Sequence, residues 1–251
     1  MKNSPPKINP KKRKGSWEDF FSPKDEGEGK NQTKPGTLYL CGTPIGNLED
    51  MTYRAVRLLG ETPLIAAEDT RRTRELLAHF EISGHLTSYH EHNKAEKGPR
   101  LINWLLSGRD LVCVSDAGLP GIADPGAQLA SQAIAAGIKV VPVPGANAAL
   151  SALIASGLDT GRFSFVGFLP RKAEKIRSLL SEIAPRRETL IFYEAPHRLR
   201  DTLSALVLGL GDRDASLARE LTKKFEACVA PQWEALAMRR KNHCAFRIKQ
   251  T

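Results

Sequence analysis

The chain has 251 residues, which is enough for one large domain or for two small ones that each bury a core. Its formal net charge of +9 at pH 7 favours a polyanionic partner, nucleic acid first, over a cationic or neutral one. The beginning is rich in lysine and proline, no apolar run is long enough to span a bilayer, and no Cys-x-x-Cys pair is present. We therefore expect a cytoplasmic protein with no membrane contact and no metal site.

Residues 1–35 are polar and broken by prolines, and we expect them to form a disordered basic extension. They contain the basic cluster Lys11-Lys12-Arg13-Lys14, which has two interpretations. The cluster could help to hold RNA, or the whole segment could be a solubilising extension without a defined role. Regular structure is predicted to begin at Gly36.

Apolar runs alternate with helix-like segments through the rest of the chain. Strands are predicted at residues 37–41, 64–67, 86–89, 111–115, 139–143, 163–168, 189–193 and 215–219. Helices are predicted at residues 52–59, from 71, at 101–106, from about 124 to 136, at 148–156, at 173–183, and in a last segment that ends near 208. Cys41 and Cys113 fall in two of the strands, where buried thiols are expected. The alternation of strands and helices favours an α/β fold.

The loop from Ser115 to Gly126 reads Ser-Asp-Ala-Gly-Leu-Pro-Gly-Ile-Ala-Asp-Pro-Gly and follows the predicted strand at residues 111–115. Asp116 therefore lies at the carboxyl end of a strand, where open α/β sheets bind their ligands. Gly118 and Gly121 permit backbone conformations that let a ligand lie against bare amides. The alternative interpretation is a tight connection between a strand and a helix, with no ligand.

The first glycine-rich turn, residues 42–50, is neither Gly-x-Gly-x-x-Gly nor a phosphate loop, which weakens any dinucleotide or nucleoside-triphosphate assignment. It belongs to a wider pattern of short loops that each follow an apolar strand. These loops are residues 44–46, 116–118, 146–147, 168–170 and 195–196. If the two halves of the chain are separate lobes, the loops could face one cleft for a flat, partly apolar ligand.

Eight segments together resemble the tetrapyrrole-methylase superfamily of S-adenosylmethionine-dependent methyltransferases. Within it they are similar to the small-subunit ribosomal RNA methyltransferases that modify a cytidine 2′-hydroxyl in 16S rRNA. The segments are Gly42-Thr43-Pro44-Ile45-Gly46-Asn47-Leu48, Ala67-Glu68-Asp69-Thr70-Arg71, Tyr89-His90-Glu91-His92-Asn93, the loop 115–126, Pro142-Val143-Pro144-Gly145-Ala146, Gly167-Phe168-Leu169-Pro170, Tyr193-Glu194-Ala195-Pro196-His197-Arg198 and Arg219-Glu220-Leu221-Thr222-Lys223-Lys224. The resemblance runs from Gly36 to about Glu226.

The resemblance implies two α/β lobes, residues 36–144 and 145–226, with S-adenosylmethionine held between them, and a homodimer. The residues that it implies for binding this cofactor are Pro44, Ile45, Gly46, Asp116, Ala117, Gly118, Ala146, Asn147, Phe168, Leu169, Ala195 and Pro196. Asp116 to Gly118 are expected to hold the amino-acid portion, because a carboxylate accepts hydrogen bonds from an ammonium group. The partner is 16S rRNA or the small ribosomal subunit.

The resemblance implies attack of a ribose oxygen on a sulfonium methyl group, for which the protein supplies alignment and could supply a base or a group that orients the hydroxyl. Glu68 and Asp69, at the end of a predicted strand, are the candidate catalytic residues. The alternative is that they cap the helix that follows. The candidate RNA-binding residues are Arg71, Arg72, His90, Asn93, Arg171 and Lys172, with a solvated surface or packing as the alternative. His90 and His92 without further ligands do not indicate a metal.

The resemblance ends after Glu226, where residues 227–251 do not continue the family pattern. A frameshift could produce such a tail, so the second lobe is expected to be incomplete, with an open sheet edge and reduced activity. Three rival functions stay open: methylation of a tetrapyrrole carbon, RNA binding by an inactive relative, and, last, dinucleotide oxidoreduction. The net charge and the His90–Asn93 segment count against the tetrapyrrole substrate.

Overall fold

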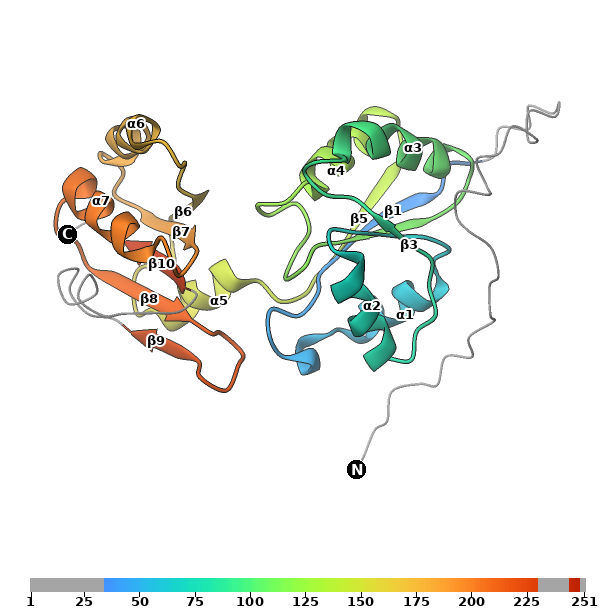
Figure 1. Cartoon of the computed structure of the whole chain (residues 1–251), viewed down its shortest axis with the longest axis horizontal. Coiled ribbons are helices and arrows are strands. Elements are labelled where there is room, and N and C mark those ends of the chain that lie inside the picture. The colour runs from blue at the N-terminus through green and yellow to red at the C-terminus, as the bar shows by residue number, and fades with distance from the viewer. Residues whose placement is uncertain (1–33, 230–243, 249–251) are drawn as a thin grey trace. The chain divides into compact units, whose positions relative to one another are not determined.

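The computed structural model describes residues 34–229 and 244–248. The chain divides into two compact units, which are Met1–Pro44 with Leu48–Ala146, and Ile45–Asn47 with Asn147–Thr251. Each unit contains one β-sheet with helices packed on it (Figure 1). Most of the predicted basic extension, residues 1–33, lies outside the described residues, as do residues 230–243 and 249–251 of the tail.

The first unit contains a five-stranded parallel sheet of order β3-β2-β4-β1-β5. Its strands are β1 (Thr37–Cys41), β2 (Ile65–Ala67), β3 (Leu86–Ser88), β4 (Leu111–Val114) and β5 (Lys139–Val143). Every residue of β2 and β4 is buried, which fits an inner parallel strand covered on both faces. All carboxyl ends lie along one edge, because the strands are parallel.

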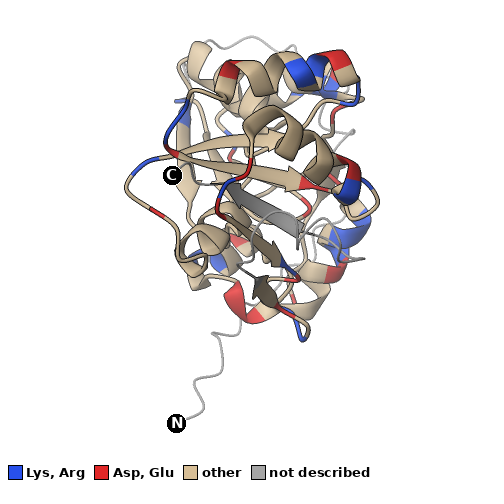
Figure 2. Cartoon of the chain, turned by 90° about the vertical axis from the view of Figure 1, so that its left-hand side faces the viewer, with Lys and Arg blue, Asp and Glu red and all other residues tan. Residues whose placement is uncertain are grey.

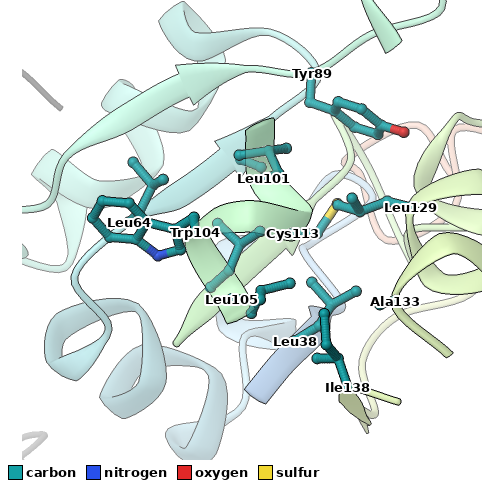
Figure 3. Packing of buried hydrophobic residues seen from close by; sticks show 12 residues of the cluster. Leu38, Leu64, Tyr89, Leu101, Trp104, Leu105, Cys113, Leu129, Ala133 and Ile138 are labelled. Carbon is teal, nitrogen blue, oxygen red and sulfur yellow. The ribbon is translucent and has the colours of Figure 1, made fainter. Parts of the chain in front are cut away.

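Helices cover both faces of this first sheet. They are the short 3-10 helix η3 (Leu48–Asp50), α1 (Tyr53–Glu61), α2 (Thr70–His79), α3 (Lys94–Leu106) and α4 (Gly126–Ala135). The cluster in Figure 3 packs Leu101 and Trp104 of α3 and Leu129 of α4 on Leu38 and Cys113 of the sheet. A second cluster joins α1 and α2 to the opposite face. Alternate strand residues therefore serve two separate cores.

The second unit contains a five-stranded mixed sheet of order β6-β7-β10-β8-β9. Its strands are β6 (Phe163–Phe168), β7 (Thr189–Glu194), β8 (Ala215–Arg219), β9 (Ala227–Val229) and β10 (Cys244–Ile248). Its helices are α5 (Ala148–Ala155), α6 (Ala173–Ile183) and α7 (Leu199–Leu210). Strands β6 and β7 are parallel, and β10 runs antiparallel to both β7 and β8. Basic and acidic residues are interspersed over the visible helices and loops in Figure 2.

Strand β7 alternates between two cores. Leu190 and Phe192 belong to the cluster that contains α6 and α7, whereas Ile191 packs with α5 on the other face. The period of two thus places an apolar residue on each face in turn, which explains why this strand reads as a continuous apolar run. Cys41 and Cys113 of the first unit are buried free thiols, as the sequence predicts.

The second sheet contains two strands that the sequence analysis does not predict. No strand is predicted after residue 219, yet β9 pairs with β8, and β10 lies between β7 and β8. These strands are only three and five residues long, and their pairing depends on partners far away in the chain, so the local pattern gives little signal. The described sheet therefore has β6 and β9 at its edges.

Candidate functional site

The loops that follow β1, β4 and β5 meet at the carboxyl edge of the first sheet. The Thr43 N–H donates to the Gly118 carbonyl over 2.9 Å, and the Gly118 N–H donates to the Thr43 carbonyl over 3.0 Å. Gly118 has φ +81°, a left-handed conformation that favours glycine. A Cβ on Gly42 would lie 2.8 Å from the Gly145 Cα atom, so the two backbones approach too closely for any side chain. The structure thus brings together three loops that the sequence places far apart.

Replacing Gly42 with alanine is expected to destabilise the first unit by about 1–3 kcal/mol, because the added methyl group meets backbone that cannot rotate away. Gly161→Ala is the matched control, since its methyl group would meet only the end of the Asp159 side chain, at 3.3 Å. Urea unfolding midpoints of both variants measure the difference. Equal midpoints would show that the approach of Gly42 and Gly145 is not tight.

Charged side chains gather beside these loops. The Asp69 N–H donates to Asp116 Oδ1 over 2.9 Å, and the Asp116 N–H donates to Glu68 Oε2 over 3.2 Å. The Arg72 guanidinium lies 3.5 Å from Asp116 Oδ2. The ends of β2 and β4 are therefore joined through Asp116, whose carboxylate keeps unused lone pairs for a further cation.

Glu68 is the member of this group that is suited to take up a proton. Burial raises the pKa of its carboxyl group above the usual range, and the negative charges of Asp116 and Asp124 raise it further. The Asp116 N–H and the Arg72 guanidinium oppose this shift. A carboxylate with a raised pKa is a better general base near neutral pH than an ordinary one.

Asp69 caps helix α2, which was the alternative to a catalytic role. Its Oδ1 atom accepts a hydrogen bond from the Arg71 N–H over 2.8 Å. The Arg71 side chain also donates to both carboxylate oxygens, over 3.1 and 2.9 Å. These hydrogen bonds lower the pKa of Asp69 to about 2, so its carboxylate is a weak proton acceptor. The Arg71 guanidinium is held by the same contact.

His90 and Asn93 shape the turn after β3. Asn93 Oδ1 accepts from the His90 N–H over 2.8 Å, and Asn93 Nδ2 donates to the Ser88 carbonyl over 3.2 Å. The amide of Asn93 is thus used within the turn. His90 Nδ1 is buried without a hydrogen-bond partner among the described residues.

Tyr193 of β7 contacts the start of α5 and two residues of β6 in the second unit. Its hydroxyl accepts a hydrogen bond from the Ala149 N–H over 3.1 Å, next to Asn147, which caps α5 through its side chain. Its ring packs edge-on against Phe165 and against Phe168, with centroids 4.9 and 5.6 Å apart. Phe168 remains half exposed. Tyr193, which is partly buried, therefore joins the start of α5, next to Asn147, to Phe168.

Glu194 and Arg198 connect the remaining predicted loops of the second unit. The Glu194 side chain is fully buried and accepts from the Ala195 N–H over 2.8 Å and from the Thr202 hydroxyl over 2.6 Å. Its Oε1 atom lies 3.6 Å from the Arg198 guanidinium. Arg198 in turn donates to the carbonyls of Leu169 and Pro170, over 3.0 and 3.2 Å. The loops 168–170 and 195–196 are thus held in one network.

The sequence prediction did not include Tyr193, Glu194 or Arg198 among the site residues, although all three lie in a matched motif. The spacing of Glu194 and Arg198, four residues apart across the start of a helix, was an available signal. Leu169, by contrast, places its side chain in the hydrophobic core, so only its backbone can face a ligand. Arg171 and Lys172 are exposed at the start of α6.

A hollow of about 300 Å³ in the first unit lies away from the predicted site residues. It is lined by Tyr39, Arg54, Arg57, Leu58, Glu61, Thr62, Asp110 and Val141. Arg57 is paired with Glu61 over 2.7 Å, and Arg54 donates to the Pro142 carbonyl. The polar groups of this hollow are therefore largely engaged with one another.

Residues 34–229 and the backbone of β10 were searched for metal sites and for membrane-spanning helices. Within them, no three His, Cys, Asp or Glu side chains gather in a way that could hold a metal ion. No helix in the same part of the chain is long and apolar enough to cross a membrane.

A sequence profile of the family described as "Tetrapyrrole (Corrin/Porphyrin) Methylases" matches residues 37–237. The match extends beyond Glu226, where the resemblance read from the sequence ends. A "Ribosomal RNA small subunit methyltransferase I" from Halalkalibacterium halodurans is 59% identical over 191 residues, which cover 76% of this chain and 66% of that protein. The protein of the same name from Bacillus subtilis is 55% identical over 194 residues, which cover 77% of this chain and 66% of its own length. The chain thus spans slightly less than two thirds of these relatives.

Among solved structures, the chain is similar to "Uroporphyrin-III C-methyl transferase from Thermus thermophilus complexed with S-adenyl homocysteine". The TM-score is 0.60 at 21% identity, and the match covers 86% of this chain and 98% of that one. At this identity the likeness establishes the fold alone.

Proposed function

This chain belongs to the tetrapyrrole methylase family, and on that premise we propose that it transfers a methyl group from S-adenosylmethionine to a cytidine 2′-oxygen of 16S rRNA. The observation that carries the proposal is the identity of 59% and 55% to two proteins named as small-subunit ribosomal RNA methyltransferases. The convergence of the predicted loops within each unit and the net charge of +9 support it.

The residues of the first unit fit the amino-acid end of S-adenosylmethionine. Asp116 offers carboxylate oxygens to an ammonium group. Gly42, Gly118 and Gly145 let the three loops beside Asp116 pack backbone against backbone. Pro44 and Ala117 border the same loops. In the second unit, Ile45, Gly46, Asn147, Phe168, the Leu169 backbone, Ala195 and Pro196, with Ala146 before them, are proposed to bind the adenosine end.

S-adenosylmethionine supplies the methyl carbon when bound. Glu68 would accept the proton of the ribose 2′-hydroxyl group, whose oxygen would bond to the methyl carbon as the carbon–sulfur bond breaks. Glu68 would become neutral, which balances the positive charge that the sulfonium group would lose. Asp69 contributes by capping α2 and by donating its N–H to Asp116.

RNA phosphates are proposed to contact Arg71, Arg72, Arg171 and Lys172, all of them exposed or largely exposed. His90 and Asn93 support this surface by fixing the turn after β3. We also propose a homodimer, which the family resemblance implies, and a cytoplasmic location, which follows from the composition of the sequence. Light scattering of the purified chain tests the homodimer directly.

A tetrapyrrole acceptor is the second candidate, because the structural neighbour is named as a uroporphyrin-III methyltransferase. Transfer of labelled methyl from S-adenosylmethionine to small ribosomal subunits, to purified 16S rRNA or to a porphyrinogen separates the two. We expect label in RNA alone. Label in the porphyrinogen would establish the second candidate, and RNA binding without any transfer would identify an inactive relative.

A further inference from the structure

The turn between β8 and β9, residues 220–226, contains most of the motif 219–224, to which the proposed function gives no role. Glu220 and Thr222 have φ values of +50° and +67°, in the left-handed region that favours glycine. Such a conformation is unfavourable for a β-branched residue and persists only where the surroundings enforce it, often at a functional site. Glu226 accepts a hydrogen bond from the Thr222 N–H and holds the turn closed.

Lys223 of this turn lies along the backbone of Gly46. A Cβ built on Gly46 would lie 2.6 Å from Lys223 Cγ and 2.8 Å from Lys223 Cε. The Thr222 hydroxyl, which is buried and has no hydrogen-bond partner among the described residues, would lie 3.0 Å away. Residue 46 therefore has to be glycine for the lysine stem to lie here, and the ammonium group, one bond beyond Cε, is held beside Gly46.

The ammonium group of Lys223 lies beside Gly46, and Glu220 neutralises its charge only in part. Its Nζ atom lies 3.6 Å from Glu220 Oε1, beyond an ordinary hydrogen bond, and 45% of its side chain is exposed. Lys224 differs in direction, since its ammonium group lies over the Phe225 ring, 5.7 Å from the centroid. The ammonium group of Lys223 thus lies at Gly46, whereas that of Lys224 lies over the exposed Phe225 ring.

We propose that Lys223 binds a phosphate of the RNA backbone next to the turn that contains Gly46. An ammonium group is a point charge with rotatable donors, which suits a phosphate oxygen and needs no base identity. The strained backbone of the turn positions the Lys223 side chain next to Gly46. The inference rests on the proposed function for the identity of its ligand.

The test compares Lys223→Met with Lys224→Met in the full chain. Methionine keeps the apolar stem and removes the charge in both variants. Binding of fluorescein-labelled 16S rRNA is followed by anisotropy over a series of salt concentrations, without any methyl donor. We expect Lys223→Met to weaken binding about fivefold and to reduce the slope of log affinity against log salt by about 1, with less than about half of either effect in Lys224→Met.

Two further results decide the proposal. Gly46→Ala, which displaces the lysine stem, is expected to weaken RNA binding as Lys223→Met does, and the double variant no further, because both remove one contact. Affinity for S-adenosylhomocysteine, measured by calorimetry, is expected to stay within twofold in Lys223→Met. Equal salt slopes in the two lysine variants, or an unchanged slope in Lys223→Met, would overturn the assignment. Because binding is measured without turnover, a chain that methylates nothing would still confirm or refute this phosphate contact.

Discussion

Glu68→Gln is expected to lower kcat for methyl transfer by about a hundredfold to ten-thousandfold, the usual contribution of a general base. Glutamine keeps an oxygen that can accept the hydrogen bond from the Asp116 N–H, so the geometry of the strand ends is retained. It cannot take up the proton of the ribose hydroxyl. Single-turnover rates with labelled donor and saturating RNA measure the loss.

The rate of methyl transfer is also expected to depend on pH through Glu68. Burial raises the pKa of Glu68, and only the deprotonated carboxylate acts as a base, so the rate is expected to rise with pH through a pKa above the ordinary value of 4.5. This rise of the rate with pH should be absent in Glu68→Gln. The control is Glu61→Gln, since Glu61 pairs with Arg57 on the surface of α1. Full activity in Glu68→Gln, or an unchanged rise of its rate with pH, would exclude Glu68 as the base.

The second large effect concerns Arg198. Arg198→Met leaves the fully buried Glu194 carboxylate without its cation, which is expected to destabilise the second unit by on the order of 3 kcal/mol. Arg198→Lys retains the charge, and most of this stability should return. A lysine cannot reproduce the guanidinium that donates to both the Leu169 and Pro170 carbonyls, so the loop 168–170 loses its fixed position.

The measurements are urea unfolding for stability and calorimetry with S-adenosylhomocysteine for the loops. Arg198→Lys is expected to unfold near the wild-type midpoint yet to bind about tenfold more weakly, a difference of about 1.4 kcal/mol. Arg200→Met, at an exposed position of α7, is the matched control and should change neither quantity. If affinity follows stability across the three variants, Arg198 has a structural role alone.

The sequence predicts the regular elements best where apolar runs have sharp boundaries. Strands β1, β5, β6 and β8 and helix α6 begin and end as predicted, because a glycine, a proline or a polar residue lies within two residues of each boundary. Helix α3 begins at Lys94, well before the predicted residue 101. Gly98 and Pro99 suggest a break there, but Pro99 lies in the second turn, and Gly98 is buried where a side chain would meet Gln132. Tertiary packing overrides the local signal.

The sequence predicts which loops form the candidate site, but it does not predict which of their residues bond to one another. The motifs place Asp116 and Glu68 at strand ends, and the structure joins them by a hydrogen bond. The sequence could not decide between a cap and a base for Asp69, because the choice depends on the position of the Arg71 guanidinium. The spacing of Glu194 and Arg198 indicates an ion pair, but the full burial of Glu194 could not be predicted, since a carboxylate is expected at the surface unless its partners are known.

The proposed methyl transfer depends first on binding of the methyl donor. Calorimetric titration of the full chain with S-adenosylhomocysteine measures it without a choice of acceptor. We expect one saturable site per chain. Asp116→Asn should bind S-adenosylhomocysteine at least tenfold more weakly, because the ammonium group of the ligand loses a charged partner. No binding to a chain that unfolds cooperatively, or equal affinity in the variant, would contradict these expectations.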